Sequence, residues 1–323
     1  MDSSLIEPAR LQLDVHGVRV LVSAAHPAHV RVLEKLGEDF AFFSRPVDDP
    51  EIRLELREGV APADVGGPIL FSTRMCTVRG AGRRRFCDYG RGLGILALNQ
   101  GDRRSLVLSD ASPGDNEALA YEISYTTLLS AIGEALDLKG YHRVHALGFE
   151  REEQGWLVVL PSGGGKSTTC ARLLRDPAVR ILSDEMPLIR DGVAYPFPVR
   201  MALRPEDAAK LFPEGGGRLF ERKIYPAKLL FPIPSERIAG PVRISRVVLE
   251  RPRLIRWFSS VVAGLGLAQM SEHMLRFDSP LRLARIALRR LAAATRLAWL
   301  CLRPLPEKDA EWLGSVFRPR PRR

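Results

Sequence analysis

The residues with the clearest chemistry form a short run of glycines that ends in Lys, Ser and Thr. The run comprises Ser162, Gly163, Gly164, Gly165, Lys166, Ser167 and Thr168. Glycines allow a tight backbone turn in which several N–H groups point at one anion. An apolar, strand-like segment at 155–160 precedes the run, and a helix-like pattern at 166–175 follows it. This order predicts a P-loop that binds the phosphate groups of a nucleotide.

Two side chains of the predicted loop have roles of their own. Lys166 can reach the β- and γ-phosphates, and the Ser167 hydroxyl can ligate Mg²⁺. The sequence departs from the full GxxxxGK[ST] pattern, because Leu160 stands at the leading glycine and Pro161 lacks an N–H donor. A glycine-rich turn that carries Lys-Ser by chance is the alternative interpretation.

Two acidic residues follow the next apolar segment along the chain. Residues 178–183 read as a short buried strand, and Asp184 and Glu185 come directly after it. Carboxylates at this distance from a P-loop helix are typical of a magnesium site. Asp184 could hold Mg²⁺ or accept a proton from an attacking hydroxyl, with Glu185 in the other role. An ordinary acidic turn before a hairpin is the alternative. His145 lies on the strand-like segment 141–150, where a lone histidine is more often structural.

Taken together, these residues resemble the HPr kinase/phosphorylase family. The matching positions are His145, Ser162, Gly163, Gly165, Lys166, Ser167, Asp184 and Glu185. The resemblance covers about 141–192 and implies a P-loop core of the phosphoenolpyruvate-carboxykinase type. It implies that Asp184 is the base acting on a serine hydroxyl, that Glu185 helps to hold the metal, and that His145 belongs to the catalytic site.

Three departures from the family are visible. Leu160 replaces the leading glycine, Glu185 replaces an aspartate, and the later Glu-x-Arg-Gly segment has no convincing copy. The β-rich N-terminal region looks more like the HPr-kinase-like proteins of peptide-biosynthesis cassettes, such as the lasso-precursor kinases and the SynChlorMet cassette protein ScmC. The resemblance implies ATP and Mg²⁺ as cofactors and a hydroxyl of a peptide or small protein as the phosphate acceptor.

Two other functions are compatible with the same residues. A small-molecule kinase with the same core would differ only in its acceptor pocket. A regulatory protein that binds a nucleotide without transferring phosphate is a second alternative, favoured by Leu160. An ABC-type ATPase is excluded because no LSGGQ-like segment is present and the acidic residues follow the loop too soon.

The surrounding sequence predicts an α/β protein with a β-rich (α+β) N-terminal domain. Alternating apolar and polar residues predict strands at 11–24 and 51–57, a meander at 69–110, and strands at 141–150, 155–160, 178–183 and 242–250. Apolar spacing predicts helices at 26–36 and 115–137, and Asp191-Gly192 predicts a hairpin turn. The proline-dense segment 195–241 is expected to be rich in loops. Of its cations, Arg200 and Arg204 are the candidates for binding substrate phosphates, with Arg222, Lys223 and Lys228 also available.

These elements divide the 323 residues into four parts. We expect a β-rich domain at 1–112, a connecting helix at 113–140, the HPr-kinase-like core at 141–278, and a basic helix and tail at 279–323. The four cysteines show no metal-ligand spacing and are expected to be reduced thiols. No signal peptide or apolar run of membrane-spanning length is found, so we expect a cytoplasmic protein without a membrane span.

Most of the positive charge lies near the C-terminus. The net charge is +10, and residues 242–323 alone contain 17 Lys and Arg against 6 Asp and Glu. A predicted helix after Pro280 carries Arg282, Arg289, Arg296 and Arg303 at seven-residue intervals. Leu281, Leu288, Leu291 and Leu297 are expected on its buried side. The arginine row fits a solvated face, a docking surface for an acidic peptide or a partner subunit, or a membrane-surface helix; nucleic acid is an unlikely partner.

Overall fold

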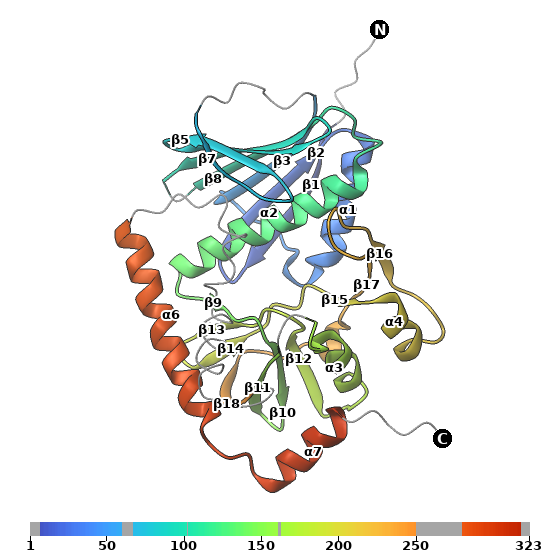
Figure 1. Ribbon diagram of the computed structural model, residues 1–323, viewed down its shortest axis with the longest axis vertical. Coiled ribbons are helices and arrows are strands. Elements are labelled where there is room, and N and C mark those ends of the chain that lie inside the picture. Colours follow the sequence, from blue (N-terminus) through green and yellow to red (C-terminus); the bar gives the residue numbers. More distant parts are fainter. Residues whose placement is uncertain (1–6, 60–66, 102, 161–162, 250–279, 318–323) are drawn as a thin grey trace. The chain divides into compact units, whose positions relative to one another are not determined.

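The computed structural model describes residues 7–59, 67–101, 103–160, 163–249 and 280–317. They form a mixed α/β protein that divides into two compact units (Figure 1). The first unit contains the described residues of 1–139 together with Phe220–Ala227. The second contains the described residues of 140–219, 228–249 and 280–317. The units are therefore not two consecutive pieces of chain.

The first unit is built on one eight-stranded sheet. Its elements are β1 (Ala9–Val15), β2 (Val18–Ala24), α1 (Pro27–Asp39), a 3-10 turn (Ala41–Phe43), β3 (Ile52–Glu58), β4 (Ile69–Ser72), β5 (Thr77–Ala81), β6 (Arg84–Gly90), β7 (Leu93–Gln100), β8 (Arg103–Asp110) and α2 (Glu117–Leu138). The strand order is β1-β2-β3-β8-β7-β6-β5-β4. The predicted meander is confirmed, because β4 to β8 pair antiparallel in sequence.

One sequence prediction for this sheet is wrong, and one feature of the sheet was not predicted. Residues 11–24 do not form one strand, because His16 and Gly17 have φ angles of 51° and 83° and close a hairpin between β1 and β2. Asp14 Oδ1 accepts the Gly17 N–H at 2.7 Å and fixes that turn. The central strand β3 also pairs parallel with both β2 and β8, so the sheet is mixed rather than antiparallel throughout.

Both helices of the first unit cover one face of its sheet (Figure 1). The predicted helix at 115–137 is α2, and it packs against α1 and the strands beneath. A buried ion pair joins it to the sheet, where Arg104 Nη2 donates to Glu134 Oε1 at 2.6 Å. Phe220 joins this unit from a distant part of the sequence and packs edge-on against Tyr121.

The second unit has a seven-stranded sheet and a smaller three-stranded one. Its elements are β9 (His142–Arg143), β10 (Leu147–Arg151), β11 (Gln154–Val159), α3 (Lys166–Leu173), β12 (Val179–Ser183), β13 (Leu188–Arg190), β14 (Val193–Tyr195), β15 (Met201–Leu203), α4 (Pro205–Leu211), β16 (Arg218–Phe220), β17 (Lys228–Phe231), a 3-10 turn (Ser235–Arg237), β18 (Val242–Leu249), α6 (Pro280–Cys301) and α7 (Glu307–Phe317). The orders are β12-β10-β11-β18-β14-β13-β9 and β15-β17-β16.

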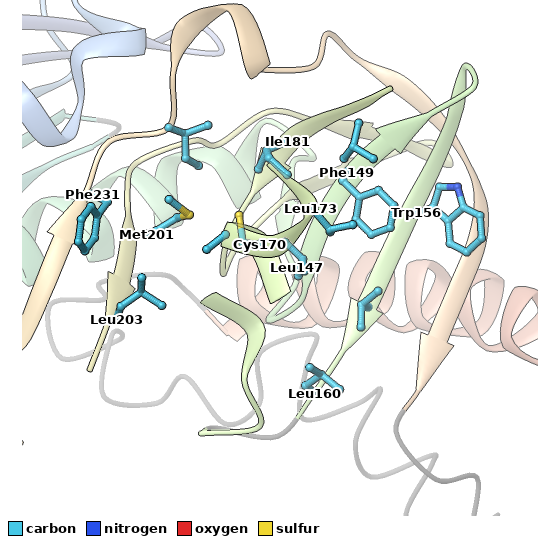
Figure 2. Close-up of a cluster of buried hydrophobic side chains, with 14 of the residues drawn as sticks. Leu147, Phe149, Trp156, Leu160, Cys170, Leu173, Ile181, Met201, Leu203 and Phe231 are labelled. Atoms are coloured by element: carbon cyan, nitrogen blue, oxygen red, sulfur yellow. The ribbon is translucent and has the colours of Figure 1, made fainter. Parts of the chain in front are cut away.

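Both faces of the large sheet are buried, as alternation along β11 shows. Trp156 and Val158 lie in a core cluster with α3 and α7, whereas Leu157 and Val159 lie in a second cluster with α6. In the first cluster, Phe149 of β10 stacks on Trp156 with ring centroids 5.7 Å apart (Figure 2). The sheet of the second unit is therefore a central layer with helices on both sides.

Several sequence predictions for this unit are confirmed, and two are wrong. The strand, glycine loop, helix and strand occur in the predicted order, and Asp191 and Gly192 form the turn of the β13–β14 hairpin. Residues 141–150 are not one strand, because 144–146 separate β9 from β10, which pair with different strands. The proline-dense segment is rich in loops as predicted, and it also contains a short sheet and α4.

The second wrong prediction concerns the C-terminal helix, α6. Its buried side chains are Ile286, Ala294 and Leu297, whereas Leu281, Leu288 and Leu291 are exposed. Alanine-rich sequence leaves the direction of the buried face open, and packing on the sheet decides it. No helix in the described part of the chain is both long and apolar enough to cross a bilayer.

Candidate functional site

The described part of the glycine loop, the acidic pair and His145 meet at one edge of the large sheet of the second unit. Strand β10 runs antiparallel to both β11 and β12, so β11 and β12 point in the same direction. The carboxyl ends of β11 and β12 therefore share an edge with the amino end of β10. The glycine loop leaves β11 there, Asp184 and Glu185 leave β12, and His145 lies just before β10. Strand order brings together residues up to 40 positions apart in the sequence.

The glycine loop needs glycine at two described positions. Gly163 and Gly165 have φ angles of 77° and 86°, the left-handed region that side chains with a Cβ rarely adopt. The first bond of α3 forms from Thr169 N–H to Gly165 O at 2.8 Å. Leu160, which replaces the leading glycine, is buried in the core cluster beside α3. Ser162 lies outside the described residues.

Lys166 is held under the loop and is 7% exposed. Its Nζ donates to Leu160 O at 3.0 Å and lies 2.9 Å from His145 Nε2. Burial lowers the pKa of Lys166, the carboxylates of Glu185 and Asp184 oppose this, and Lys228 lowers the pKa further. An anion placed on the loop would add negative charge beside this buried ammonium.

His145 is positioned by the backbone of the turn after β12. Ala146 N–H donates to Glu185 O at 3.1 Å, and Val144 N–H donates to Pro187 O at 3.0 Å. Burial first, and the nearby Lys166 charge second, lower the pKa of His145, although Glu185 opposes them. A neutral imidazole accepts the Lys166 hydrogen bond at Nε2, and Nδ1 faces Glu185 Oε1 at 3.7 Å.

Asp184 is buried beside the first turn of α3. The Ser167 hydroxyl donates to Asp184 Oδ2 at 2.7 Å, and the carboxylate is 2% exposed. Burial raises the pKa of Asp184 to about 7, against the opposing effects of the Ser167 hydrogen bond, the Ala202 N–H and Lys228. Glu185 adds to the increase through its charge. Oδ1 of Asp184 is buried and has no hydrogen-bond partner among the described residues.

The remaining predicted ligands have different surroundings. The Glu185 side chain is 55% exposed, and Thr168 is half-buried on α3. Among the described residues, no group of three or more His, Cys, Asp or Glu is arranged to hold a metal ion alone. Mg²⁺ is usually held by one or two carboxylates, with water and substrate phosphates completing its shell. The Ser167 hydroxyl and the unpartnered Asp184 Oδ1 fit that pattern.

The two predicted substrate arginines are unequal candidates. Arg204 precedes α4, its side chain is 64% exposed, and it pairs with Glu206 at 3.2 Å and Asp207 at 2.9 Å. Arg200 is half-buried just before β15.

Lys228 is the cation that the structure brings toward the reactive groups. It is half-buried at the start of β17, which pairs antiparallel with β15, the strand of Ala202. Its charge acts on both Lys166 and Asp184. No hydrogen bond or ion pair joins Lys228 to another described residue. The sequence names Lys228 only as one of five cations, since its 44-residue separation from Asp184 carries no spacing signal.

Comparisons with known proteins add no relative to this picture. A scan against protein-family models and a search of curated proteins both find no match to the chain. The interpretation of the site therefore rests on its residues and their geometry.

Proposed function

We propose that this protein is an ATP-dependent kinase with a P-loop core of the HPr kinase and phosphoenolpyruvate-carboxykinase type. The observation that carries the proposal is the convergence of four groups at one sheet edge: the glycine loop, Lys166, Ser167 and the buried Asp184. A left-handed glycine turn at a helix N-terminus suits phosphate oxygens. A buried carboxyl beside it suits proton transfer.

The loop amides and the N-terminus of α3 would bind the β- and γ-phosphates of ATP. Lys166 would exchange its bond to Leu160 O for a phosphate oxygen, and His145 would keep the ammonium at the loop during that exchange. Ser167 and Glu185 would hold Mg²⁺, which neutralises phosphate charge when it is bound. Positioning and charge stabilisation are what phosphoryl transfer chiefly requires.

Asp184 would act as the base. Its pKa of about 7 gives the carboxylate appreciable proton affinity at neutral pH, which an ordinary exposed aspartate lacks. The acceptor hydroxyl oxygen forms a bond to the γ-phosphorus while the bond from that phosphorus to the ADP oxygen breaks. The hydroxyl proton passes to Asp184. The acceptor we favour is a serine hydroxyl of a peptide or small protein. The partner of this protein would then be a polypeptide.

A test of the function measures ADP release by the purified protein with Mg²⁺ and ATP. We expect ADP release to be slow without an acceptor and at least ten-fold faster with one. When the ATP is labelled with ³²P at the γ-phosphate, the label should be recovered on the acceptor. Label on small hydroxyl compounds but not on serine peptides would identify a small-molecule kinase. Nucleotide binding without acceptor-dependent release across both classes would contradict the kinase proposal and leave a nucleotide-binding regulator.

Lys228 provides a sharper test of the site's geometry. Replacing it in Lys228→Met should lower kcat/KM for ATP by about 10–100-fold, the range for losing one charge-assisted contact. Arg204→Met should change kcat/KM by less than about two-fold, because Glu206 and Asp207 already neutralise Arg204 at the surface. Steady-state kinetics on both variants shows whether Lys228 or Arg204 is the cation that acts on the nucleotide. A larger effect at Arg204 than at Lys228 would mean that the wrong cation has been assigned.

A further inference from the structure

The outward side of α6 carries an apolar stripe that the described residues of the second unit leave exposed. The exposed fractions are 84% at Leu281, 67% at Leu288, 51% at Leu291 and 64% at Trp299. At about 100° per residue these side chains fall on one side of the helix. Ile286, Ala294 and Leu297 occupy the opposite side, in the core against the sheet. The stripe is therefore additional to the face that holds α6 in place.

Arginines lie along one flank of this stripe. Arg285, Arg289 and Arg296 are all exposed, and they follow the same turns as the exposed leucines. From Pro280 to Cys301 the helix contains no Asp or Glu. The surface thus combines exposed Leu and Trp with unbalanced positive charge, which is the composition of helices that lie in a membrane interface.

We propose that α6 binds the surface of a bilayer containing anionic phospholipid, with its apolar stripe among the acyl chains and its arginines at the headgroups. The opposite, core-facing side remains packed on the sheet. The surface of an anionic bilayer offers acyl chains to the exposed leucines and negative headgroups to the arginines beside them. A second copy of the chain is a poorer fit, because it brings another arginine-lined α6 without acids to offset the charge.

The test uses the full-length protein and vesicle co-sedimentation. Vesicles of phosphatidylcholine with one quarter phosphatidylglycerol should bind the wild type, and vesicles of pure phosphatidylcholine should bind it at least ten-fold more weakly. Raising the salt concentration should release the protein, because headgroup attraction is screened. Equal binding to both compositions, or no binding to either at low salt, would overturn the proposal.

Two pairs of variants separate the apolar and charged contributions. The double variant Leu288→Glu with Trp299→Glu should lose vesicle binding at least ten-fold, whereas Ile69→Glu, at an exposed position of β4, should not. The double variant Arg289→Gln with Arg296→Gln should weaken binding by roughly five-fold per arginine. Its matched control removes two exposed arginines of the first unit, in Arg79→Gln with Arg84→Gln.

Circular dichroism and thermal unfolding establish that each variant is folded. The arginine pair keeps the proposal testable if the glutamate variants unfold, because glutamine at an exposed helix position disturbs little packing. Light scattering tests the remaining alternative, in which the apolar stripe is an interface between two copies of the chain. If the wild type dimerises, the Leu288→Glu and Trp299→Glu variant is monomeric, and vesicles bind neither, then the stripe is a protein interface and the membrane proposal is wrong.

Discussion

Replacing Lys166 with alanine is expected to lower the rate of phosphoryl transfer by about 10²–10³-fold, the cost of removing one preorganised donor to a developing charge. In the free protein the ammonium is nearly buried between Leu160 O and His145 Nε2, at 3.0 and 2.9 Å. It therefore stands at the loop before a nucleotide arrives. The measurements are kcat with a saturating acceptor and the Kd for ATP by calorimetry. We expect the Kd for ATP to increase as well.

Lys210→Ala is the matched control, because it removes the same charge from an exposed position of α4. We expect it to retain the wild-type rate and affinity. A Lys166→Ala protein that binds ATP and transfers phosphate normally would remove the basis for placing the phosphates on this loop. A variant that binds ATP normally but transfers no phosphate would instead assign Lys166 wholly to the transition state.

Asp184→Asn is expected to have two opposite effects. Transfer should fall by about 10²–10⁴-fold, because asparagine cannot accept the hydroxyl proton. The protein without nucleotide or metal should at the same time become more stable at pH 8. Burial raises the pKa of Asp184 from about 3.8 to about 7, so at pH 8 the folded wild type holds a buried charge that the unfolded chain would expose to water. Neutral asparagine removes that cost, which is on the order of a few kcal/mol.

The direction of the pH dependence follows from proton binding. Between about pH 4 and pH 7 the folded state binds more protons at Asp184 than the unfolded state does, so its contribution to stability falls as pH rises through this window. The advantage of Asp184→Asn in melting temperature should be several degrees at pH 8 and should shrink toward pH 5. Calorimetry in EDTA measures it, with Asp191→Asn in the exposed hairpin turn as the control. An advantage that does not vary with pH would contradict the raised pKa.

The local order of elements in the second unit could be predicted because each signal lies within a few residues. Apolar runs and glycines predict β11, the loop, α3 and β12, and Asp191-Gly192 predicts the hairpin turn. The neighbour relations could not be predicted, because pairing between strands depends on the whole sheet. Parallel pairing of β3 with β2 and β8 is one such case. The division of 141–150 into β9 and β10 is another, since each half follows a different partner.

The candidate site divides in the same way. Lys166, Ser167 and Asp184 were predicted from spacing, and the fold places them together. The importance of Lys228 depends on the pairing of β17 with β15, which no local pattern indicates. Leu160 looked like a defect of the phosphate loop, yet its side chain is part of the core beneath α3. A sequence pattern records what a backbone position permits and does not record what its side chain packs against.

The segment Phe220–Ala227 determines which fragments of this protein contain a complete first unit. It lies between stretches of the second unit in sequence but belongs to the first, where Lys223 N–H donates to the buried Glu122 Oε2 at 2.7 Å and Lys223 Nζ donates to Tyr89 O at 2.6 Å. A gene fragment that stops after Lys139 would encode the eight strands and both helices yet omit the Lys223 N–H that donates to this carboxylate. A fragment of the first unit should therefore include Phe220–Ala227 through a fused linker, or the full-length chain should be used.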